Sequence, residues 1–208
     1  MFNIVILISG SGTNLQAIIE ACKAGKINGV VSGVISNNPK AYGLERAKNY
    51  NIPSLTIDHS NFSSREDFDS SLVSGINSFK PDLVVLAGFM RILSPVVTDT
   101  FNNMMINIHP SLLPKYPGLD THTQVLANND KEHGVTIHSV SAELDGGPII
   151  AQAKIPVKSN QKLDDLIKRI HSIEHMLFPK VINLIANGQI KIQELGLKQE
   201  VLYENYDV

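Results

Sequence analysis

The stretch that most constrains the fold is Asn3–Ile8, which is almost entirely aliphatic and mostly β-branched. A run of this kind without polar alternation predicts a strand that is covered on both faces. Helical spacing follows at Leu15–Ala24, and strands and helices then alternate through the first half of the chain. Such alternation predicts right-handed crossovers and a parallel sheet. We therefore expect an α/β fold, with a mostly parallel Rossmann-like sheet and helices on both faces.

The later strands follow one another without a helix between them, so we expect them to pair antiparallel at one side of the sheet. No repeat, low-complexity tract or linker interrupts the 208 residues, which predicts a single domain over 1–208. The expected strands are Asn3–Ile8, Val30–Ile35, Ser54–Ile57, Asp82–Ala87, the strand ending at His109, Val135–Val140 and Pro148–Val157. We also expect one short strand in the tail from Lys191. The expected helices are Leu15–Ala24, Tyr42–Tyr50, a helix opened by the capping box Ser63–Glu66, one begun by Ser94-Pro95, His122–Asn128 and Leu163–Ala186.

Composition excludes several classes of protein. The net charge is −2 and no Lys/Arg cluster occurs, which argues against a nucleic-acid surface. No apolar run approaches the roughly 20 residues of a membrane span, and the first strand lacks the basic leader of a signal peptide. Cys22, the single cysteine, cannot form an internal disulfide. We expect a cytoplasmic protein that acts on small molecules, without nucleic-acid or membrane partners.

Acid–base chemistry is concentrated at the end of the strand Met105–His109. Side chains alternate along a strand, so Ile106 and Ile108 share one face, and Asn107 and His109 share the other. Pro110 then stops the strand and begins a stiff loop with two further prolines. Two polar groups aimed the same way suggest a catalytic pair. The alternative is an ordinary polar strand end with a lone histidine.

A glycine-rich turn, Gly10–Asn14, joins the first strand to the first helix. Its uncovered backbone N–H groups and the helix N-terminus suit a phosphate group. The turn is not the dinucleotide fingerprint, because Leu15 stands at the third glycine position, and it lacks the Gly-Lys-Ser/Thr of a Walker A loop. A single phosphate, such as a ribose 5-phosphate, fits best. The alternative is a purely structural turn.

Asp145 stands in a second glycine turn, Glu143-Leu-Asp-Gly-Gly-Pro148. Asp-Gly is a common hairpin signal, so an ordinary turn is the competing interpretation. The catalytic interpretation requires Asp145 to reach His109.

A His-x-x-Glu-His pattern at His171–His175 matches a zinc-peptidase motif. A catalytic zinc needs three protein ligands, and the acids that follow lie on an expected strand or tail and not on a facing helix. We therefore expect no metal, and interpret Glu174 as a carboxylate that faces a cationic or hydroxylated ligand. Four further histidines are expected at surface or loop positions: His59, His122, His133 and His138. Of these, His138 alternates with Thr136 along a strand and could line the same cleft as His109.

Taken together, these motifs resemble those of the phosphoribosylglycinamide formyltransferases, within the folate-dependent formyltransferase group. The resemblance covers about residues 3–190 in the same order. It is carried by Ser-Gly-Ser-Gly-Thr-Asn14, Leu-Ala-Gly-Phe-Met-Arg-Ile-Leu93, Ile-Asn-Ile-His-Pro-Ser-Leu-Leu-Pro-Lys-Tyr-Pro-Gly118, Glu-Leu-Asp-Gly-Gly-Pro148 and Glu174-His175 with Phe178-Pro179.

The resemblance implies a formyltransferase-type fold and transfer of the formyl group of 10-formyltetrahydrofolate, as cosubstrate, to the amine of glycinamide ribonucleotide in purine synthesis. It implies a phosphate-binding N-terminal half, a folate-binding and catalytic C-terminal half, and a monomer or homodimer. Substrate contacts are implied for Gly12, Thr13, Asn14 and Glu174, and folate contacts for Arg65, Met90, Arg91, Ile92, Leu93, Asn107, Ser141, Ala142, Glu143, Leu144 and Asp145.

The implied catalytic set is Asn107, His109 and Asp145. Amine attack on a formamide creates a tetrahedral oxyanion, to which Asn107 and a protonated His109 can donate. Asp145, directly or through a water, can accept the proton of the amine. A formyltetrahydrofolate hydrolase with a similar triad is the alternative, and a non-catalytic nucleotide-binding module is a third class. Asp120 departs from the family pattern beside the catalytic loop, and the sequence offers no account of its effect.

Overall fold

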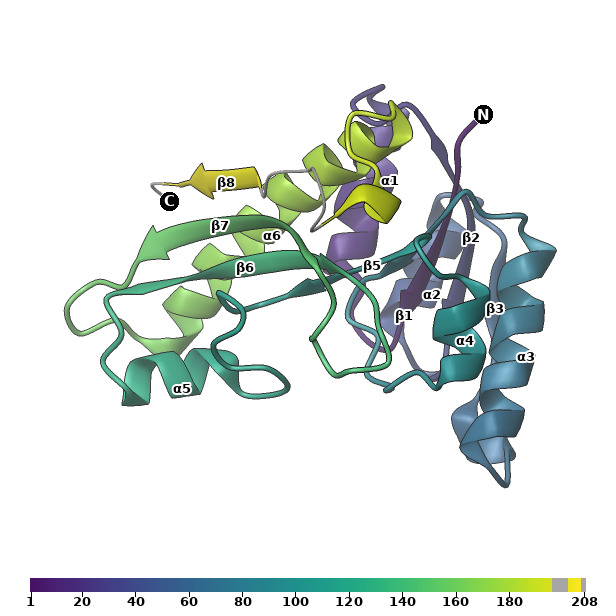
Figure 1. Cartoon of the computed structure of the whole chain (residues 1–208), viewed down its shortest axis with the longest axis horizontal. Helices are drawn as coiled ribbons and strands as arrows, with labels where there is room; N and C mark the ends of the chain where they lie inside the picture. Colours follow the sequence, from purple (N-terminus) through teal and green to yellow (C-terminus); the bar gives the residue numbers. More distant parts are fainter. Residues whose placement is uncertain (196–201, 207–208) are drawn as a thin grey trace.

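The computed structural model describes residues 1–195 and 202–206, and within them eight strands form one sheet in the order β3-β2-β1-β4-β5-β6-β7-β8 (Figure 1). The strands are β1 (Asn3–Ile8), β2 (Val30–Ser36), β3 (Ser54–Thr56), β4 (Leu83–Leu86), β5 (Met105–His109), β6 (Glu132–Ser139), β7 (Ile149–Pro156) and β8 (Leu202–Asn205). The helices are α1 (Thr13–Lys23), α2 (Tyr42–Asn49), α3 (Arg65–Ser78), α4 (Pro95–Thr100), α5 (Thr121–Ala127) and α6 (Leu163–Ala186), with short 3-10 turns at His59–Asn61 and Ile192–Glu194.

The sheet changes direction between β5 and β6. Strands β1 to β5 pair parallel with one another, whereas β6 pairs antiparallel with both β5 and β7. This confirms the expected mixed sheet with antiparallel strands at one side. The strand β8 pairs parallel with β7, and this late strand in the tail takes an edge of the sheet. The tail residues 196–201 and 207–208 lie outside the described part of the chain.

Alternate residues of the central strand β1 serve two separate apolar cores. Ile4, Ile6 and Ile8 belong to the core that includes residues of α1 and α6, whereas Val5 and Leu7 pack with residues of α3 and α4. In Figure 1, α3 and α4 lie together on one side of the parallel strands. Burial on both faces explains why this strand has no polar alternation, and it confirms the expectation of helices on both faces.

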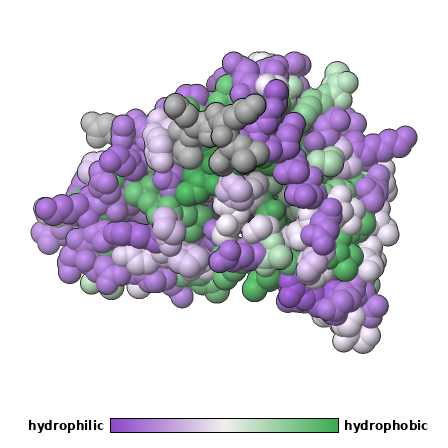
Figure 2. All heavy atoms as spheres, viewed as in Figure 1, coloured by the Kyte–Doolittle hydropathy of each residue, from purple (hydrophilic) through white to green (hydrophobic). Residues whose placement is uncertain are grey.

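The face of the molecule seen in Figure 2 is mostly polar. The face seen in Figure 2 carries hydrophilic residues around most of its rim, with hydrophobic patches between them. Among the described residues, no helix has the length and apolar character needed to cross a membrane.

The capping box of α3 lies one residue later than expected. Ser64, and not Ser63, is the N-cap, and its hydroxyl accepts a 3.0 Å hydrogen bond from the backbone N–H of Asp67. The Asp67 carboxylate in turn accepts a 2.8 Å bond from the Ser64 hydroxyl. Both serines precede an acid at the right spacing, so only the backbone could distinguish the two alternatives.

Phe178 gives a direct test of the core around α6. Its side chain is fully buried among residues of the β1 and α6 core. Phe178→Ala should lower the free energy of unfolding by about 3–5 kcal/mol, because it removes a large buried side chain and leaves a cavity. Urea denaturation measures this loss. Met176→Ala, on the exposed face of the same helix, should cost less than about 1 kcal/mol; equal losses would contradict this assignment of the core.

Candidate active site

The end of β5 presents two polar side chains on one face. Ile106 and Ile108 are buried in the core shared with α6, and Asn107 and His109 lie on the opposite face. Across the antiparallel ladder, Asn107 is paired with His138 and His109 with Thr136. The alternation predicted from the sequence is confirmed, and it brings β6 residues beside both groups.

Asp145 reaches these residues from the loop between β6 and β7. Its Oδ2 lies 3.4 Å from His109 Nδ1, and its Oδ1 lies 3.6 Å from His138 Nε2. The backbone of Asp145 is left-handed, with φ of 50°, a conformation that an aspartate tolerates better than most residues. The structure therefore brings Asn107, His109 and Asp145 together, which is the condition that the catalytic interpretation required.

Hydrogen bonds define where the ring protons of the two histidines lie. His109 Nε2 donates to the carbonyl of Tyr116 at 2.8 Å, and His138 Nδ1 donates to its neighbour Ser139 at 2.9 Å. His138 Nε2 is therefore free to accept from the Asn107 amide at 3.1 Å. His109 Nδ1 faces the Asp145 carboxylate, which can only accept a hydrogen bond. A doubly protonated His109 ring would therefore have one acceptor for each of its two N–H groups.

The proline loop that follows β5 is tied to β6 and β7. The buried Thr136 hydroxyl donates to the Ser111 carbonyl and accepts from the backbone N–H of Leu113. Gln152 on β7 bonds both Thr136 and the Leu113 carbonyl. This network fixes the loop beside the face of β5 that carries Asn107 and His109, because each buried polar group in it is satisfied.

Asp145 is held as a carboxylate. Burial raises its pKa, but the neighbouring His138 side chain, the hydrogen bond from the backbone N–H of Gly118 and the charge of His109 bring the pKa below the usual range. The Gly118 bond is 2.8 Å long. An ionised Asp145 is the form that can stabilise a protonated His109 or accept a proton.

The glycine turn that precedes α1 is pressed against the start of α2. Gly12 is left-handed, with φ of 70°, and a Cβ added to it would lie 2.7 Å from the Gly43 backbone. The Gly43 N–H donates to the Gly10 carbonyl, and Arg46 Nε donates to the Ser11 carbonyl. Because no side chain caps α1, the N–H groups of its first turn remain available to an anion.

Glu174 connects α6 to this turn. Its carboxylate accepts a 3.1 Å hydrogen bond from the side chain of Asn14, in the first turn of α1. The residue is 5% exposed, and burial raises its pKa to about 7, against a smaller lowering by the Asn14 bond. A buried carboxyl group with a strongly raised pKa is typical of functional sites, and this one lies beside the glycine turn.

Apart from Asn107 on β5, the residues predicted to contact folate lie on three segments that adjoin one another. Arg65 begins α3 and pairs with Asp69, which also accepts from the Ser94 backbone N–H. The Arg91 guanidinium lies 6.0 Å from the ring centre of Phe68, also on α3. Leu93 is buried in the same core against which Val140 packs, immediately before Ser141. Their exposed apolar side chains include Met90, Ile92 and Leu144.

Two histidines predicted at the surface are in fact buried. His138 is 3% exposed and His133 1% exposed. His122 Nδ1 and His133 Nε2 share a 2.9 Å hydrogen bond, and burial lowers their pKa values to about 4 and about 3. A pair of neutral imidazoles can satisfy one another, which is why two polar residues fit in this position.

Among residues 1–195 and 202–206, the fold brings no third ligand to the histidines of the zinc-peptidase motif. His171 and His175 stack on one face of α6, with ring centres 6.3 Å apart, as their spacing predicts. In the part of the chain that the structure describes, no group of three or more His, Cys, Asp or Glu side chains could hold a metal ion.

Two contacts with His109 and Asp145 were not predicted because they come from the backbone. The Tyr116 carbonyl accepts from His109, and the Gly118 N–H donates to Asp145. Both residues belong to the proline loop, whose stiffness was the only signal in the sequence. Thr136, which anchors that loop, carries no motif of its own.

Comparisons with known proteins identify the family of this chain. A family model described as formyl transferase matches residues 2–182. Phosphoribosylglycinamide formyltransferase of Escherichia coli is 53% identical over 192 residues, covering 92% of this chain and 91% of that protein. The human trifunctional purine biosynthetic protein adenosine-3 is 38% identical over 93% of this chain, which spans 19% of that longer protein.

Solved structures give the same result. The structure of glycinamide ribonucleotide transformylase 1 from Symbiobacterium toebii superposes with a TM-score of 0.88 at 45% identity. That match covers 90% of this chain and 89% of the other. Phosphoribosylglycinamide formyltransferase from Anaplasma phagocytophilum has the same TM-score at 36% identity, with 99% of both chains covered.

Glu174 should make the folded protein less stable as the pH rises. Its pKa is about 7 when folded and near the ordinary 4.5 when unfolded, so between these values the unfolded chain loses a proton that the folded chain keeps. The free energy of unfolding therefore falls over this range, by about 3 kcal/mol in total. Glu174→Gln cannot ionise and should be more stable than the unaltered protein at pH 8, while the two should be alike at pH 4.5.

Urea denaturation at the two pH values measures this difference. Glu45→Gln, at an exposed position on α2, is the matched control and should show no comparable gain. A Glu174→Gln protein that is less stable than the unaltered one at pH 8 would contradict the burial argument.

Proposed function

The chain belongs to the formyl transferase family, and we propose how its residues carry out the phosphoribosylglycinamide formyltransferase reaction of de novo purine biosynthesis. In this reaction a formyl group passes to the amine of N1-(5-phosphoribosyl)glycinamide. The proposed donor is 10-formyltetrahydrofolate, which leaves as tetrahydrofolate. The observation that carries the proposal is the convergence of Asn107, His109 and Asp145 at the same edge of the sheet as a turn suited to phosphate.

Asn107 and His109 stabilise the charge that develops on the formyl oxygen. The Asn107 amide gives one N–H to His138, which leaves its second N–H for the oxyanion. When its nitrogen facing Asp145 is protonated, the His109 ring adds positive charge beside the same oxygen. Donors fixed in place before the reaction are effective because they need no reorganisation.

Asp145 accepts the proton of the attacking amine. Its lowered pKa keeps it ionised at neutral pH, so it can accept that proton directly or through one water. The proton then passes to the departing nitrogen of the folate. The proposed reaction forms one C–N bond and breaks another, and it involves no covalent bond to the enzyme.

The glycine turn and Glu174 bind the ribonucleotide. The N–H groups of Gly12, Thr13 and Asn14 face the phosphate, where the N-terminus of α1 contributes partial positive charge. Glu174, once ionised, accepts hydrogen bonds from the hydroxyl or amine groups of the same substrate. The Asn14–Glu174 bond supports this assignment, because it joins the two parts of the seat.

The folate lies across the segments that follow β4 and β6. Exposed apolar side chains at Met90, Ile92 and Leu144 suit a flat aromatic ring, as is usual in ligand sites. Arg65 and Arg91 supply guanidinium groups for the carboxylates of the folate. The remaining proposed folate contacts are Leu93, Asn107, Ser141, Ala142, Glu143 and Asp145.

Several broader assignments belong to the same proposal. Residues 1–208 form one formyltransferase domain, with the phosphate seat in its N-terminal half and the folate and catalytic residues in its C-terminal half. The protein acts on small molecules in the cytoplasm as a monomer or homodimer, without nucleic-acid or membrane partners. Side chains supply both charge stabilisation and proton transfer, so no step calls for a metal.

A transfer assay tests the reaction and the roles of its residues. The unaltered protein should form tetrahydrofolate from 10-formyltetrahydrofolate only when glycinamide ribonucleotide is present. His109→Gln and Asp145→Asn should each lower kcat by about 10²–10³-fold, because each removes a group that acts in the transition state. Asp99→Asn, at an exposed position, should keep full activity. Release of formate at full rate without the amine would favour the hydrolase instead.

The phosphate seat is tested by two glycines of the same turn. Gly12→Ala should raise the KM for glycinamide ribonucleotide by about tenfold, since left-handed backbone costs an alanine 1–2 kcal/mol or so and the new Cβ meets the Gly43 backbone. The KM for the folate should stay within about twofold of its original value. Gly10→Ala is the matched control, because its Cβ would meet nothing within 4 Å. Equal effects at both glycines would contradict the proposed seat.

A further inference from the structure

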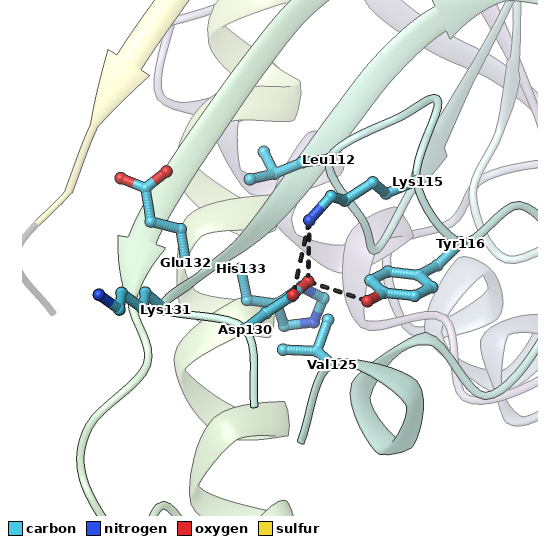
Figure 3. A pocket seen from close by; sticks show the side chains of 8 residues that line it. All are labelled: Leu112, Lys115, Tyr116, Val125, Asp130, Lys131, Glu132 and His133. Atoms are coloured by element: carbon cyan, nitrogen blue, oxygen red, sulfur yellow. Dashed lines mark hydrogen bonds and ion pairs between the residues drawn. The ribbon is translucent and has the colours of Figure 1, made fainter. Parts of the chain in front are cut away.

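Tyr116 connects the catalytic histidine to a hollow on the far side of the proline loop. Its carbonyl accepts the hydrogen bond from His109 Nε2, at 2.8 Å. Its side chain points the other way and lines a hollow of about 600 Å³ between the proline loop, α5 and the start of β6. Figure 3 shows Tyr116 and Lys115 reaching towards Asp130 in this hollow.

Asp130 holds the side chain of Tyr116. The phenol donates a 2.9 Å hydrogen bond to Asp130 Oδ2, and it accepts a 2.9 Å bond from the Asn128 amide. Lys115 Nζ lies 3.3 Å from the same carboxylate oxygen. We call Tyr116, Asn128 and Asp130 the tyrosine clasp. It joins the middle of the proline loop to the turn between α5 and β6.

The backbone of Tyr116 needs such support. Its φ is 56°, a left-handed conformation that costs a bulky residue on the order of 1–2 kcal/mol. Such a conformation persists only where the surroundings hold it in place. The direction of the Tyr116 carbonyl depends on that conformation, and this carbonyl is the acceptor for His109 Nε2.

We infer that Asp130 and the phenol of Tyr116 are positioning residues for the transfer reaction. The clasp fixes the Tyr116 carbonyl, the carbonyl fixes the ring of His109, and the opposite nitrogen of that ring is thereby directed at Asp145. Two residues further along, the Gly118 N–H bonds Asp145 itself. A shift of Tyr116 would therefore disturb both partners of the His109–Asp145 pair. This inference rests on the proposed function.

Two other polar side chains of the hollow have separate partners. His133 is bonded to His122, and Glu132 is bonded to Lys154. Lys115 approaches Asp130 from the exposed side, with 65% of its side chain accessible, so solvent screens its charge. The bonds of the phenol to Asp130 and Asn128 are therefore the contacts that hold the Tyr116 side chain.

The test compares kcat with KM in a set of single substitutions. Tyr116→Phe and Asp130→Ala should each lower kcat on the order of tenfold, because a small misplacement of a catalytic group slows the chemical step. The KM values for both substrates should stay within about twofold, since neither residue belongs to a proposed substrate seat. Asp130→Asn keeps an oxygen that can accept from the phenol and should restore most of the rate. Lys115→Met leaves the phenol bond intact and should behave like the unaltered protein.

A spectroscopic measurement accompanies the kinetics and does not depend on turnover. In protein labelled with ¹⁵N-histidine, the His109 Nε2 resonance, assigned by its loss in His109→Gln, should move in Tyr116→Phe and Asp130→Ala and stay in place in Lys115→Met. If kcat and this resonance are unchanged in both variants, the inference is overturned. A protein that shows no formyl transfer at all but displays these shifts would refute the proposed function and leave the clasp supported.

Discussion

The carboxylate of Asp145 is the group on which the arrangement of the site depends. It accepts a hydrogen bond from the Gly118 N–H and lies within 3.6 Å of ring nitrogens of both His109 and His138. These partners come from the proline loop, β5 and β6, so a single charge draws three segments together. A buried carboxylate is costly unless it is paired and hydrogen-bonded, and Asp145 meets that requirement only when all three segments are in place.

The reversal of strand direction between β5 and β6 makes this convergence possible. The parallel strands bring the glycine turn, the segment after β4 and the end of β5 to one edge of the sheet, where ligands of open α/β folds bind. The antiparallel strand β6 then runs back beside β5, which sets His138 opposite Asn107 and Thr136 opposite His109. The proposed phosphate site thus belongs to the parallel half, and the proposed proton-transfer groups lie where the two halves meet.

The sequence predicted most of the strands and each segment of the site, because runs such as Asn3–Ile8 and glycine turns carry strong local signals. It could not establish that Asp145 reaches His109, since that contact depends on how the loop after β6 folds back. It also assigned His133 to the surface, because a buried neutral histidine pair leaves no mark in a single sequence. The sequence could not indicate the roles of the Tyr116 carbonyl and the Gly118 N–H either, because nearly every residue carries the same backbone groups.

The most direct test of this account is a pH titration of Asp145 by ¹³C NMR of its carboxyl carbon, assigned by the loss of that signal in Asp145→Asn. The hydrogen bonds and charges that converge on this group predict an inflection below the ordinary aspartate pKa of 3.8. An inflection above 3.8 in the folded protein would mean that burial outweighs those contacts. The carboxylate would then not be the group that organises the site.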